Sequence, residues 1–190
     1  MPELLHLSLE RISTPIGELL VVADDDGRLR AVDWEDYADR MHRLLRRYYS
    51  VGFKLETGSG LSGRIAAFRA YFAGDLTALE RLPVETGGTA FQGVVWRALR
   101  SIRVGTTMSY AALARAIGRP AAVRAVGLAN GANPISIVLP CHRVIGSDGT
   151  LTGYGGGLER KRWLLAHEGA SFTLQLDNAT QTKTGTRVVL

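Results

Sequence analysis

The only cysteine of the chain lies in the stretch Ile137-Val138-Leu139-Pro140-Cys141-His142-Arg143-Val144-Ile145. An imidazole stands directly beside the thiol, and an apolar run lies on each side. The thiolate is the reactive form of cysteine, and neighbouring His142 and Arg143 would lower the thiol pKa. Cys141 is therefore a candidate nucleophile. The alternative is an inert thiol, because a single cysteine in an intracellular chain is most often a small buried hydrophobic residue.

Length and composition indicate a globular protein with a reduced thiol. The chain has 190 residues and is 46% hydrophobic, so it can bury a substantial core, and we expect two domains. One cysteine excludes an internal disulfide, and no Cys/His cluster has zinc spacing. The first residues lack the features of a signal peptide, and no apolar run approaches a membrane span. We expect a cytoplasmic protein without contact to a membrane.

Charge is divided unevenly along the chain. Residues 1–88 carry 11 Lys and Arg against 14 Asp and Glu, whereas residues 89–168 carry 10 against 3. The cysteine lies in the basic part. A positive field confined to one half favours a polyanionic partner, most simply nucleic acid, and a solvated basic face without a partner is the alternative.

The first half of the chain has the pattern of a small antiparallel sheet with helices. Residues 19–23 and 29–34 are apolar runs on either side of a turn with an Asp-Gly step, which predicts a hairpin. Apolar residues at helical spacing predict a helix over 36–48 and a second one that ends near Gly74. We expect a loop over 52–63. The arginines of the first helix are interpreted as a solvated face: Arg43, Arg46 and Arg47.

From about residue 88 the pattern becomes helical. An apolar stripe predicts a helix over 91–103, and Ser109 is a good N-cap for a short helix that Gly118 ends. Pro120 fits the first turn of a further helix. Helix, tight turn and helix together are the outline of a helix-turn-helix motif.

The second helix of this motif carries small side chains almost throughout. Arg124 is its one long charged residue, which is unusual for a helix that reads bases in the major groove. A slim helix suits shape-tolerant binding in the minor groove. The alternative is close packing against a neighbouring helix. The small residues are Ala121, Ala122, Ala125, Gly127, Ala129 and Gly131.

The segments around the cysteine predict a rigid support and a flexible wall. The apolar run 135–139 indicates a short buried strand or extended segment that leads to Pro140. Residues 153–157, Gly-Tyr-Gly-Gly-Gly, form a loop that lacks the Lys and Ser/Thr of a phosphate-binding loop. A helix is expected over 158–167.

Together these motifs resemble the O6-alkylguanine-DNA alkyltransferases. The resemblance rests on Pro-Cys-His-Arg-Val at 140–144, Asn133-Pro134, Gly153-Tyr154 and the run from Trp163 to Gly169, and it covers residues 88–169. It implies a ribonuclease-H-like domain over 1–87 with a small antiparallel sheet and helices. It also implies a mostly helical domain over 88–169 with a helix-turn-helix and the active-site cysteine. Residues 170–190 are left as a tail.

The resemblance implies single-use repair, in which an alkyl group passes irreversibly from O6 of a flipped-out guanine to Cys141. His142, oriented by Glu168, would take the thiol proton through a water molecule. Asn133 would brace the active-site turn, and Tyr110 would serve the target phosphate and the N3 edge of the base. O4-alkylthymine stays open as a second substrate.

The resemblance also implies which residues contact DNA and the flipped base. Arg124 would replace the extruded nucleotide in the stack. Some relatives have Ser or Ala where this chain has Gly155, so a side-chain hydrogen bond to the alkylated oxygen is lost and larger adducts could fit. The expected DNA-binding residues are Arg124, Tyr110, Ala125, Ala129 and Gly127, and the expected pocket residues are Tyr154, Gly155, Val144 and Pro140.

The expected partner is double-stranded DNA with O6-alkylguanine, bound by a monomer that can cluster on DNA. We expect no cofactor and no metal, and the Cys-rich zinc domain of the regulatory alkyltransferases has no counterpart in the sequence. Two alternatives remain at this point. A Cys/His hydrolase would use the same pair of residues with turnover, and a helix-turn-helix protein with an inert cysteine would bind DNA without transfer.

Overall fold

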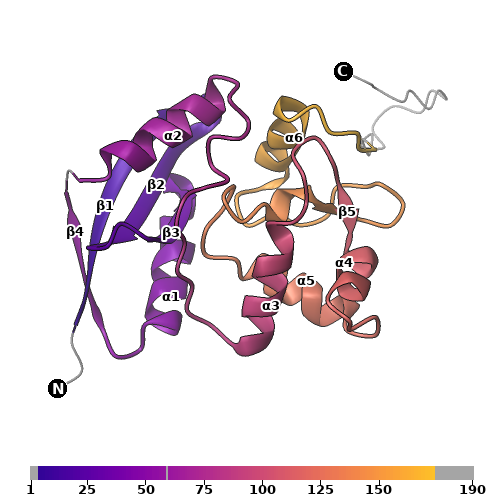
Figure 1. Cartoon of the computed structure of the whole chain (residues 1–190), viewed down its shortest axis with the longest axis horizontal. Helices are drawn as coiled ribbons and strands as arrows, with labels where there is room; N and C mark the ends of the chain where they lie inside the picture. Colours follow the sequence, from indigo (N-terminus) through magenta and orange to yellow (C-terminus); the bar gives the residue numbers. More distant parts are fainter. Residues whose placement is uncertain (1–3, 59, 174–190) are drawn as a thin grey trace.

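The computed structural model describes residues 4–58 and 60–173. Its first half is a four-stranded sheet in the order β3-β2-β1-β4 (Figure 1). Strands β1 (Leu5–Thr14), β2 (Gly17–Asp24) and β3 (Leu29–Trp34) are antiparallel. The hairpin between β2 and β3 turns at Gly27, whose φ of 72° suits glycine and whose amide donates to the Asp24 carbonyl. The predicted hairpin is confirmed.

The expected loop over 52–63 is wrong in its first part. Residues Phe53–Thr57 form β4, which pairs with β1 in parallel, so the sheet is mixed rather than purely antiparallel. This edge strand is short and includes Lys54 and Glu56, which form an exposed ion pair. Charged residues on a five-residue strand are typical of sheet edges and weaken the strand pattern in the sequence.

Two helices cover opposite faces of the sheet, as Figure 1 shows for α1 (Ala38–Tyr48) and α2 (Ser62–Phe72). A single turn of 3-10 helix, η1 (Glu35–Tyr37), precedes α1. Met41 and Leu45 of α1 pack on one face of the sheet, whereas Ile65 and Phe68 of α2 join the main core on the other. Both predicted helices are confirmed.

The second half is mainly helical, with α3 (Ala90–Leu99), α4 (Tyr110–Ala116), α5 (Val123–Gly131) and α6 (Leu158–His167). A short parallel pair, β5 (Met108–Ser109) and β6 (Val144–Ile145), lies beside them. The Ser109 side chain accepts from the Ala112 amide, so the predicted N-cap and the helix-turn-helix of α4 and α5 are confirmed.

Two helix boundaries differ from expectation. The helix α3 ends at Leu99 instead of 103, where the Ser101 hydroxyl donates to the Ala98 carbonyl and competes with the helical backbone. Pro120 lies in the turn before α5 rather than in its first turn, because the Ala122 amide bonds back to the Arg119 carbonyl and the helix begins at Val123.

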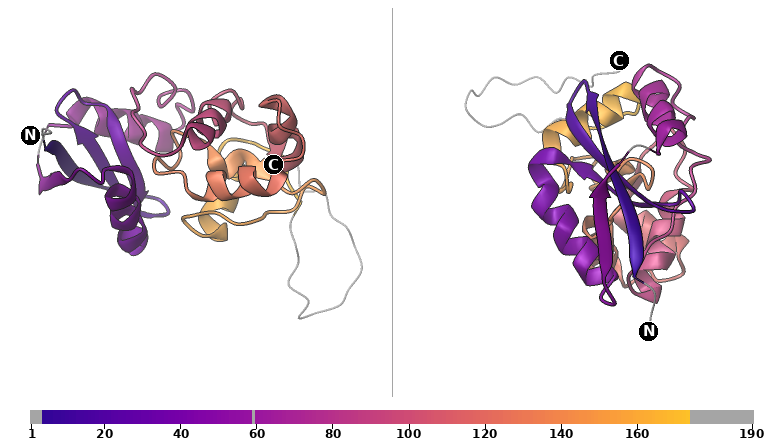
Figure 2. Two further views of the ribbon diagram at one scale, coloured as in Figure 1. Left: turned by 90° about the horizontal axis from the view of Figure 1, so that it is seen from below. Right: turned by 90° about the vertical axis from the view of Figure 1, so that its left-hand side faces the viewer.

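The two halves share one continuous hydrophobic core, and the segment before the cysteine connects them. Residues 135–139 are buried as expected but form no strand. Only Ile135 bridges to Val32 of β3, and the backbone then turns through Ile137 at φ 71°. A β-branched residue in this left-handed region is strained by about 1–3 kcal/mol. The left view of Figure 2 shows the two halves side by side.

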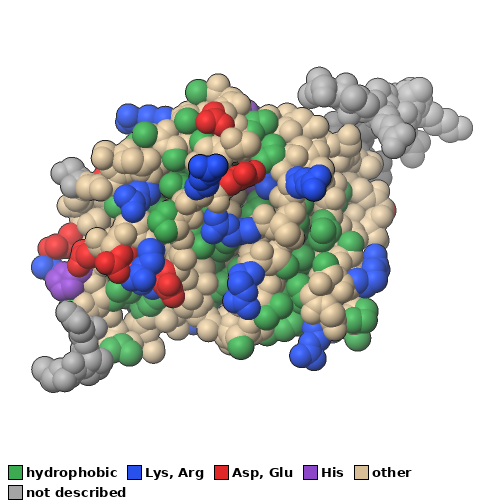
Figure 3. Space-filling model, in the orientation of Figure 1, with side chains coloured by type: hydrophobic (Ala, Val, Ile, Leu, Met, Phe, Trp, Pro, Cys, Tyr) green, Lys and Arg blue, Asp and Glu red, His purple; other side chains and the backbone are tan. Residues whose placement is uncertain are grey.

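The described part of the chain has no helix long and apolar enough to cross a membrane. The surface in Figure 3 agrees with the uneven charge of the sequence, because acidic side chains on this face lie over the N-terminal half while Lys and Arg occur over both halves. Most of the expected tail, residues 174–190, lies outside the described residues.

Candidate active site

Cys141 begins a turn of 3-10 helix, η2 (Cys141–Arg143), and is 4% exposed. Burial raises the pKa of its thiol, whereas a hydrogen bond from Asn133 and the charges of Arg40 and Lys161 work to lower it. The expectation that His142 and Arg143 lower this pKa is therefore wrong on both counts. The net shift is upward, and the cations that act on the thiol come from distant parts of the chain.

His142 and Glu168 meet in the interior, as the sequence predicts. The distance from His142 Nε2 to Glu168 Oε1 is 2.9 Å, and both side chains are buried. Since the carboxylate accepts, Nε2 carries the proton and Nδ1 carries the lone pair. Burial lowers the pKa of His142 even though Glu168 works to raise it. The imidazole is thus neutral at pH 7, and its buried Nδ1 has no partner among the described residues.

Glu168 is the centre of this network. Its carboxylate also accepts from the Tyr71 hydroxyl at 2.8 Å and from Arg143 Nε and Nη2 at 2.8 and 2.9 Å. Burial works to raise the Glu168 pKa, but His142 and Arg143 outweigh it and hold the pKa far below its usual range. The carboxylate is therefore ionised throughout the neutral range and holds the imidazole in one orientation.

Arg143 and Tyr71 complete the network, and the sequence analysis assigned neither of them to it. Arg143 donates its remaining Nη1 to the Ile102 carbonyl, so its charge belongs to Glu168 rather than to the thiol. Tyr71 comes from α2 in the N-terminal half and was seen only as part of an apolar stripe. Its hydroxyl within that apolar stripe was the one signal in the sequence.

Asn133 braces the turn before the cysteine, as expected. Its side chain donates to the Leu139 carbonyl at 2.8 Å and accepts from the Ile135 amide at 2.9 Å. Asn130, which the sequence analysis missed, donates weakly to the carbonyl of Cys141 and to the Tyr110 hydroxyl, each at 3.4 Å. The two asparagines tie α5 to the cysteine turn.

Tyr110 is the first residue of α4, and burial raises its pKa. It lines an open hollow of about 370 Å³ on the outer side of the helix-turn-helix, together with Val123, Arg124, Gly127, Leu128 and Thr152. The structure therefore brings together three of the expected DNA-contacting residues, namely Tyr110, Arg124 and Gly127. Figure 1 shows α4 and α5 next to each other at this place.

The exposed face of α5 carries Arg124 and Ala125, with Leu128 72% exposed on the same side. Ala129 does not belong to it. Its side chain is 2% exposed and packs in the core, and its carbonyl accepts from Trp96 Nε1 at 2.8 Å. The assignment of Ala129 to DNA binding is wrong because only part of the small-residue stripe faces outward. The rest serves close packing of α5 against α3.

Residues 155–157 of the loop 153–157 are closely packed rather than a flexible wall, whereas Gly153 is exposed. A side chain at Gly156 would come within 2.3 Å of Trp34 Nε1, and one at Gly155 within 2.7 Å of the Arg40 guanidinium. The Tyr154 ring meets the His142 ring edge-on at 6.5 Å. Burial raises the pKa of Tyr154, whose hydroxyl has no hydrogen-bond partner among the described residues. The loop thus lies between the cysteine turn and the N-terminal half.

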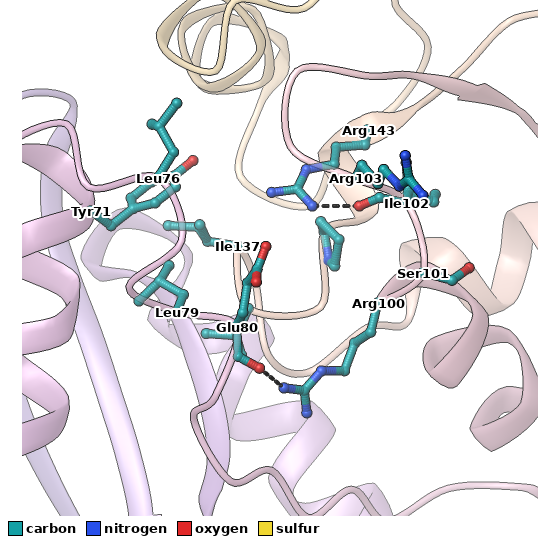
Figure 4. A pocket seen from close by; sticks show the side chains of 12 residues that line it. Tyr71, Leu76, Leu79, Glu80, Arg100, Ser101, Ile102, Arg103, Ile137 and Arg143 are labelled. Atoms are coloured by element: carbon teal, nitrogen blue, oxygen red, sulfur yellow. Dashed lines mark hydrogen bonds between the residues drawn. The ribbon is translucent and has the colours of Figure 1, made fainter.

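The two other expected pocket residues lie on either side of this turn. Val144 is fully buried, and its carbonyl accepts from Lys161 Nζ at 2.6 Å. Pro140 lines a cavity of about 280 Å³ that Tyr71 and Arg143 also border, and Figure 4 shows its lining. Lys161 was not singled out in the sequence. It is fully buried, and burial lowers its pKa to about 8 although the nearby thiol works against this.

The arrangement defines a class: a protein with a helix-turn-helix in which one buried cysteine has a neutral histidine and an ionised carboxylate behind it. No group of three or more metal-ligating side chains occurs within residues 4–58 and 60–173. Asn133 lies eight residues before the cysteine and Glu168 lies 27 residues after it, and helix α6 places Glu168 at its C-terminal end.

Comparisons with known proteins place the chain in a family. Residues 90–170 match the family described as 6-O-methylguanine DNA methyltransferase, DNA binding domain, and residues 9–86 match its ribonuclease-like domain. A methylated-DNA--protein-cysteine methyltransferase of Shigella flexneri is 53% identical over 87% of this chain and 98% of its own. The crystal structure of Mycobacterium tuberculosis OGT in complex with DNA is similar with a TM-score of 0.71 and 44% identity, over 86% of this chain and 92% of that chain. The chain belongs to the 6-O-methylguanine DNA methyltransferase family.

Proposed function

We propose that this protein repairs DNA by direct reversal and moves the alkyl group of O6-alkylguanine onto Sγ of Cys141. The observation that carries the proposal is the buried contact between His142 and Glu168 directly behind the single cysteine. Membership of the family supports the same reaction. The fold and this family leave no support for a Cys/His hydrolase or for an inert DNA-binding protein.

The first step is activation of the thiol. Because burial keeps the thiol protonated, it needs a base, and the neutral His142 offers the Nδ1 lone pair. We propose that the proton reaches Nδ1 through one bridging water molecule. The imidazolium that forms is stabilised by the ionised Glu168, which Arg143 and Tyr71 hold in place.

The second step is substitution at the alkyl carbon. Sγ attacks this carbon, the S–C bond forms, and the bond between the carbon and O6 breaks with its electron pair on guanine. A proton then neutralises the guanine, and Tyr110 is the proposed donor at its N3 edge. The His142 imidazolium then returns a proton to the Tyr110 phenolate through solvent, so the net reaction moves the thiol proton to guanine. The product is a thioether without a second half-reaction, so each molecule acts once.

Delivery of the base is assigned to the helix-turn-helix. We propose that α5 enters the minor groove with its exposed face, which includes Ala125 and Gly127, and that Arg124 fills the gap left by the flipped nucleotide. Flipping costs a few kcal/mol, and backbone and shape contacts can supply it without sequence readout. The proposed wall of the base pocket consists of Tyr154, Gly155, Val144 and Pro140.

Further parts of the proposal concern organisation. We propose a division into residues 1–87, 88–169 and 170–190, supported by the change in charge along the chain. We also propose a monomer that clusters on DNA, and a cytoplasmic site of action, where a reducing environment keeps the single thiol reactive. O4-alkylthymine is a proposed second substrate.

The test is a stoichiometric reaction with a duplex that contains O6-methylguanine. Mass spectrometry of the peptide with Cys141 should show one added methyl group per molecule and no turnover. Cys141→Ser should bind the duplex and take up no methyl group. A folded, DNA-binding wild-type protein without this adduct would refute the proposal. Rates on methyl and benzyl adducts test whether Gly155 widens the substrate range.

A further inference from the structure

We infer that α1 in the N-terminal half carries a second DNA-contacting surface, formed by Arg43 and Arg47, which binds backbone phosphates beside the helix-turn-helix. This inference rests on the proposed function, because it assumes that α5 lies on a DNA duplex. It adds a DNA-binding surface in the N-terminal half, where the sequence alone indicated that the arginines form a solvated face.

The first support is the charge on α1. Arg43, Arg46 and Arg47 are exposed, and none of them forms a hydrogen bond or ion pair with any residue in 4–58 or 60–173. Of the acidic residues just before them, Glu35 pairs with Arg11 and Asp36 with Arg160, whereas Asp39, one turn before Arg43, forms no ion pair with it or with any other residue in the described ranges. Three adjacent cations without counter-ions repel one another, and an external polyanion would relieve this repulsion.

The second support is the position of α1 relative to α5. Arg40 Nη2 donates to the carbonyls of Gly131 and Asn133 at 2.8 and 3.0 Å, and the Tyr48 hydroxyl donates to the Ala132 carbonyl at 2.8 Å. These bonds seat α1 against the C-terminal end of α5. Both helices lie at the lower side of the molecule in Figure 1 and are in view from below in Figure 2.

The third support is helical spacing, which aligns the exposed faces of the two helices. On α5, Arg124, Leu128 and Gly131 follow one another at intervals of four and three residues, so they share one face that ends where Arg40 binds. On α1, Arg40, Arg43 and Arg47 have intervals of three and four and share a face in the same way. The two faces therefore meet at the bond between Arg40 and Gly131.

The length of this combined surface fits a duplex. Seven residues of helix rise about 10 Å, so the distance from Arg124 to Arg47 is at most about 20–25 Å, the value for two such faces placed end to end. At about 3.4 Å per base pair this corresponds to roughly six or seven base pairs. Arg43 and Arg47 would then contact phosphates several base pairs from the flipped base, outside the reach of the helix-turn-helix.

Arg69 provides a matched control. It is also exposed and has no side-chain hydrogen bond or ion pair with any residue in 4–58 or 60–173, but it belongs to α2, which covers the opposite face of the sheet from α1. Binding to duplexes with arms of about twelve and of about four base pairs around the lesion is measured over a range of salt. With Arg43→Gln and Arg47→Gln combined, the slope of log K against log salt should fall by about 2 on the long duplex.

The same double variant should bind the short duplex like wild type, and Arg69→Gln should keep the wild-type slope on both. If wild type binds and becomes methylated but the double variant has an unchanged slope on the long duplex, the inference about α1 is overturned and the proposed function is not. An equal loss with Arg69→Gln would also overturn it, because the effect would then be one of net charge. Failure of wild type to bind and be methylated would instead refute the proposed function.

Discussion

Tyr71→Phe tests whether the N-terminal half takes part in the chemistry of Cys141. The Tyr71 hydroxyl donates to Glu168 Oε1 at 2.8 Å, the same oxygen that His142 Nε2 contacts at 2.9 Å. Phenylalanine keeps the ring, which packs edge-on against Phe72 and His167, and removes one donor. The substitution therefore leaves the core filled and changes only the carboxylate.

The expected loss of stability follows from the contacts that remain. A hydrogen bond to a charged group contributes about 1.5–3 kcal/mol, and we expect the lower end because His142 and Arg143 still bind Oε1. A loss of about 1.5 kcal/mol raises the unfolded fraction about tenfold. With a urea slope of about 2 kcal/mol per M, the midpoint should fall by about 0.7 M with an unchanged slope.

The pH dependence of methylation should change as well. With one donor fewer, Oε1 holds more negative charge toward His142 and raises the pKa of the imidazole. Since only the neutral imidazole can accept the thiol proton, the acid limb of the rate profile should move to higher pH. Tyr49→Phe is the control, because its hydroxyl donates to a neutral carbonyl at 3.3 Å. A Tyr71→Phe protein with the midpoint and acid limb of wild type would refute this reasoning.

Three further predictions concern buried positions. Burial holds the pKa of Lys161 at about 8, against 10.5 in the unfolded chain, so between these values the unfolded chain binds more protons and stability rises with pH. In urea titrations across this pH window, the stability of wild type relative to Lys161→Met should rise by up to about 3 kcal/mol, and a constant difference would contradict the assignment. Gly156→Ala should cost about 1–3 kcal/mol of stability and slow methylation, since its Cβ meets Trp34 Nε1 and Cδ1 at 2.3 and 2.4 Å. Adding Trp34→Phe should restore part of the stability and part of the rate, and no recovery in the double variant would count against the contact. Ala129→Leu should lower the thermal midpoint by overfilling the core, whereas Ala125→Leu should leave the midpoint unchanged and weaken DNA binding. The reverse pattern would show that the buried and exposed faces of α5 were assigned the wrong way round.

Local patterns were enough to predict most elements. The hairpin at Gly27, the cap at Ser109 and the helix over 158–167 depend on neighbouring residues, and they appear as expected. The strand β4 and the ends of α3 depend on weaker signals, namely an edge strand with charges and a serine that competes for a carbonyl, and these were missed. Turns, caps and helices can be predicted from the sequence because the residues that determine them lie within a few positions of one another.

The sequence by itself determined the reactive pair Cys141 and His142, the helix-turn-helix and the resemblance that links Glu168 to them. Only the tertiary structure decided the state of the thiol and the direction of each face of α5. Burial, which no local pattern encodes, raises the pKa of Cys141 and turns Ala129 inward. The packing of the two halves brings Tyr71 and Arg40 to the site, and α6 brings Lys161, because charges and hydrogen bonds act through space rather than along the chain.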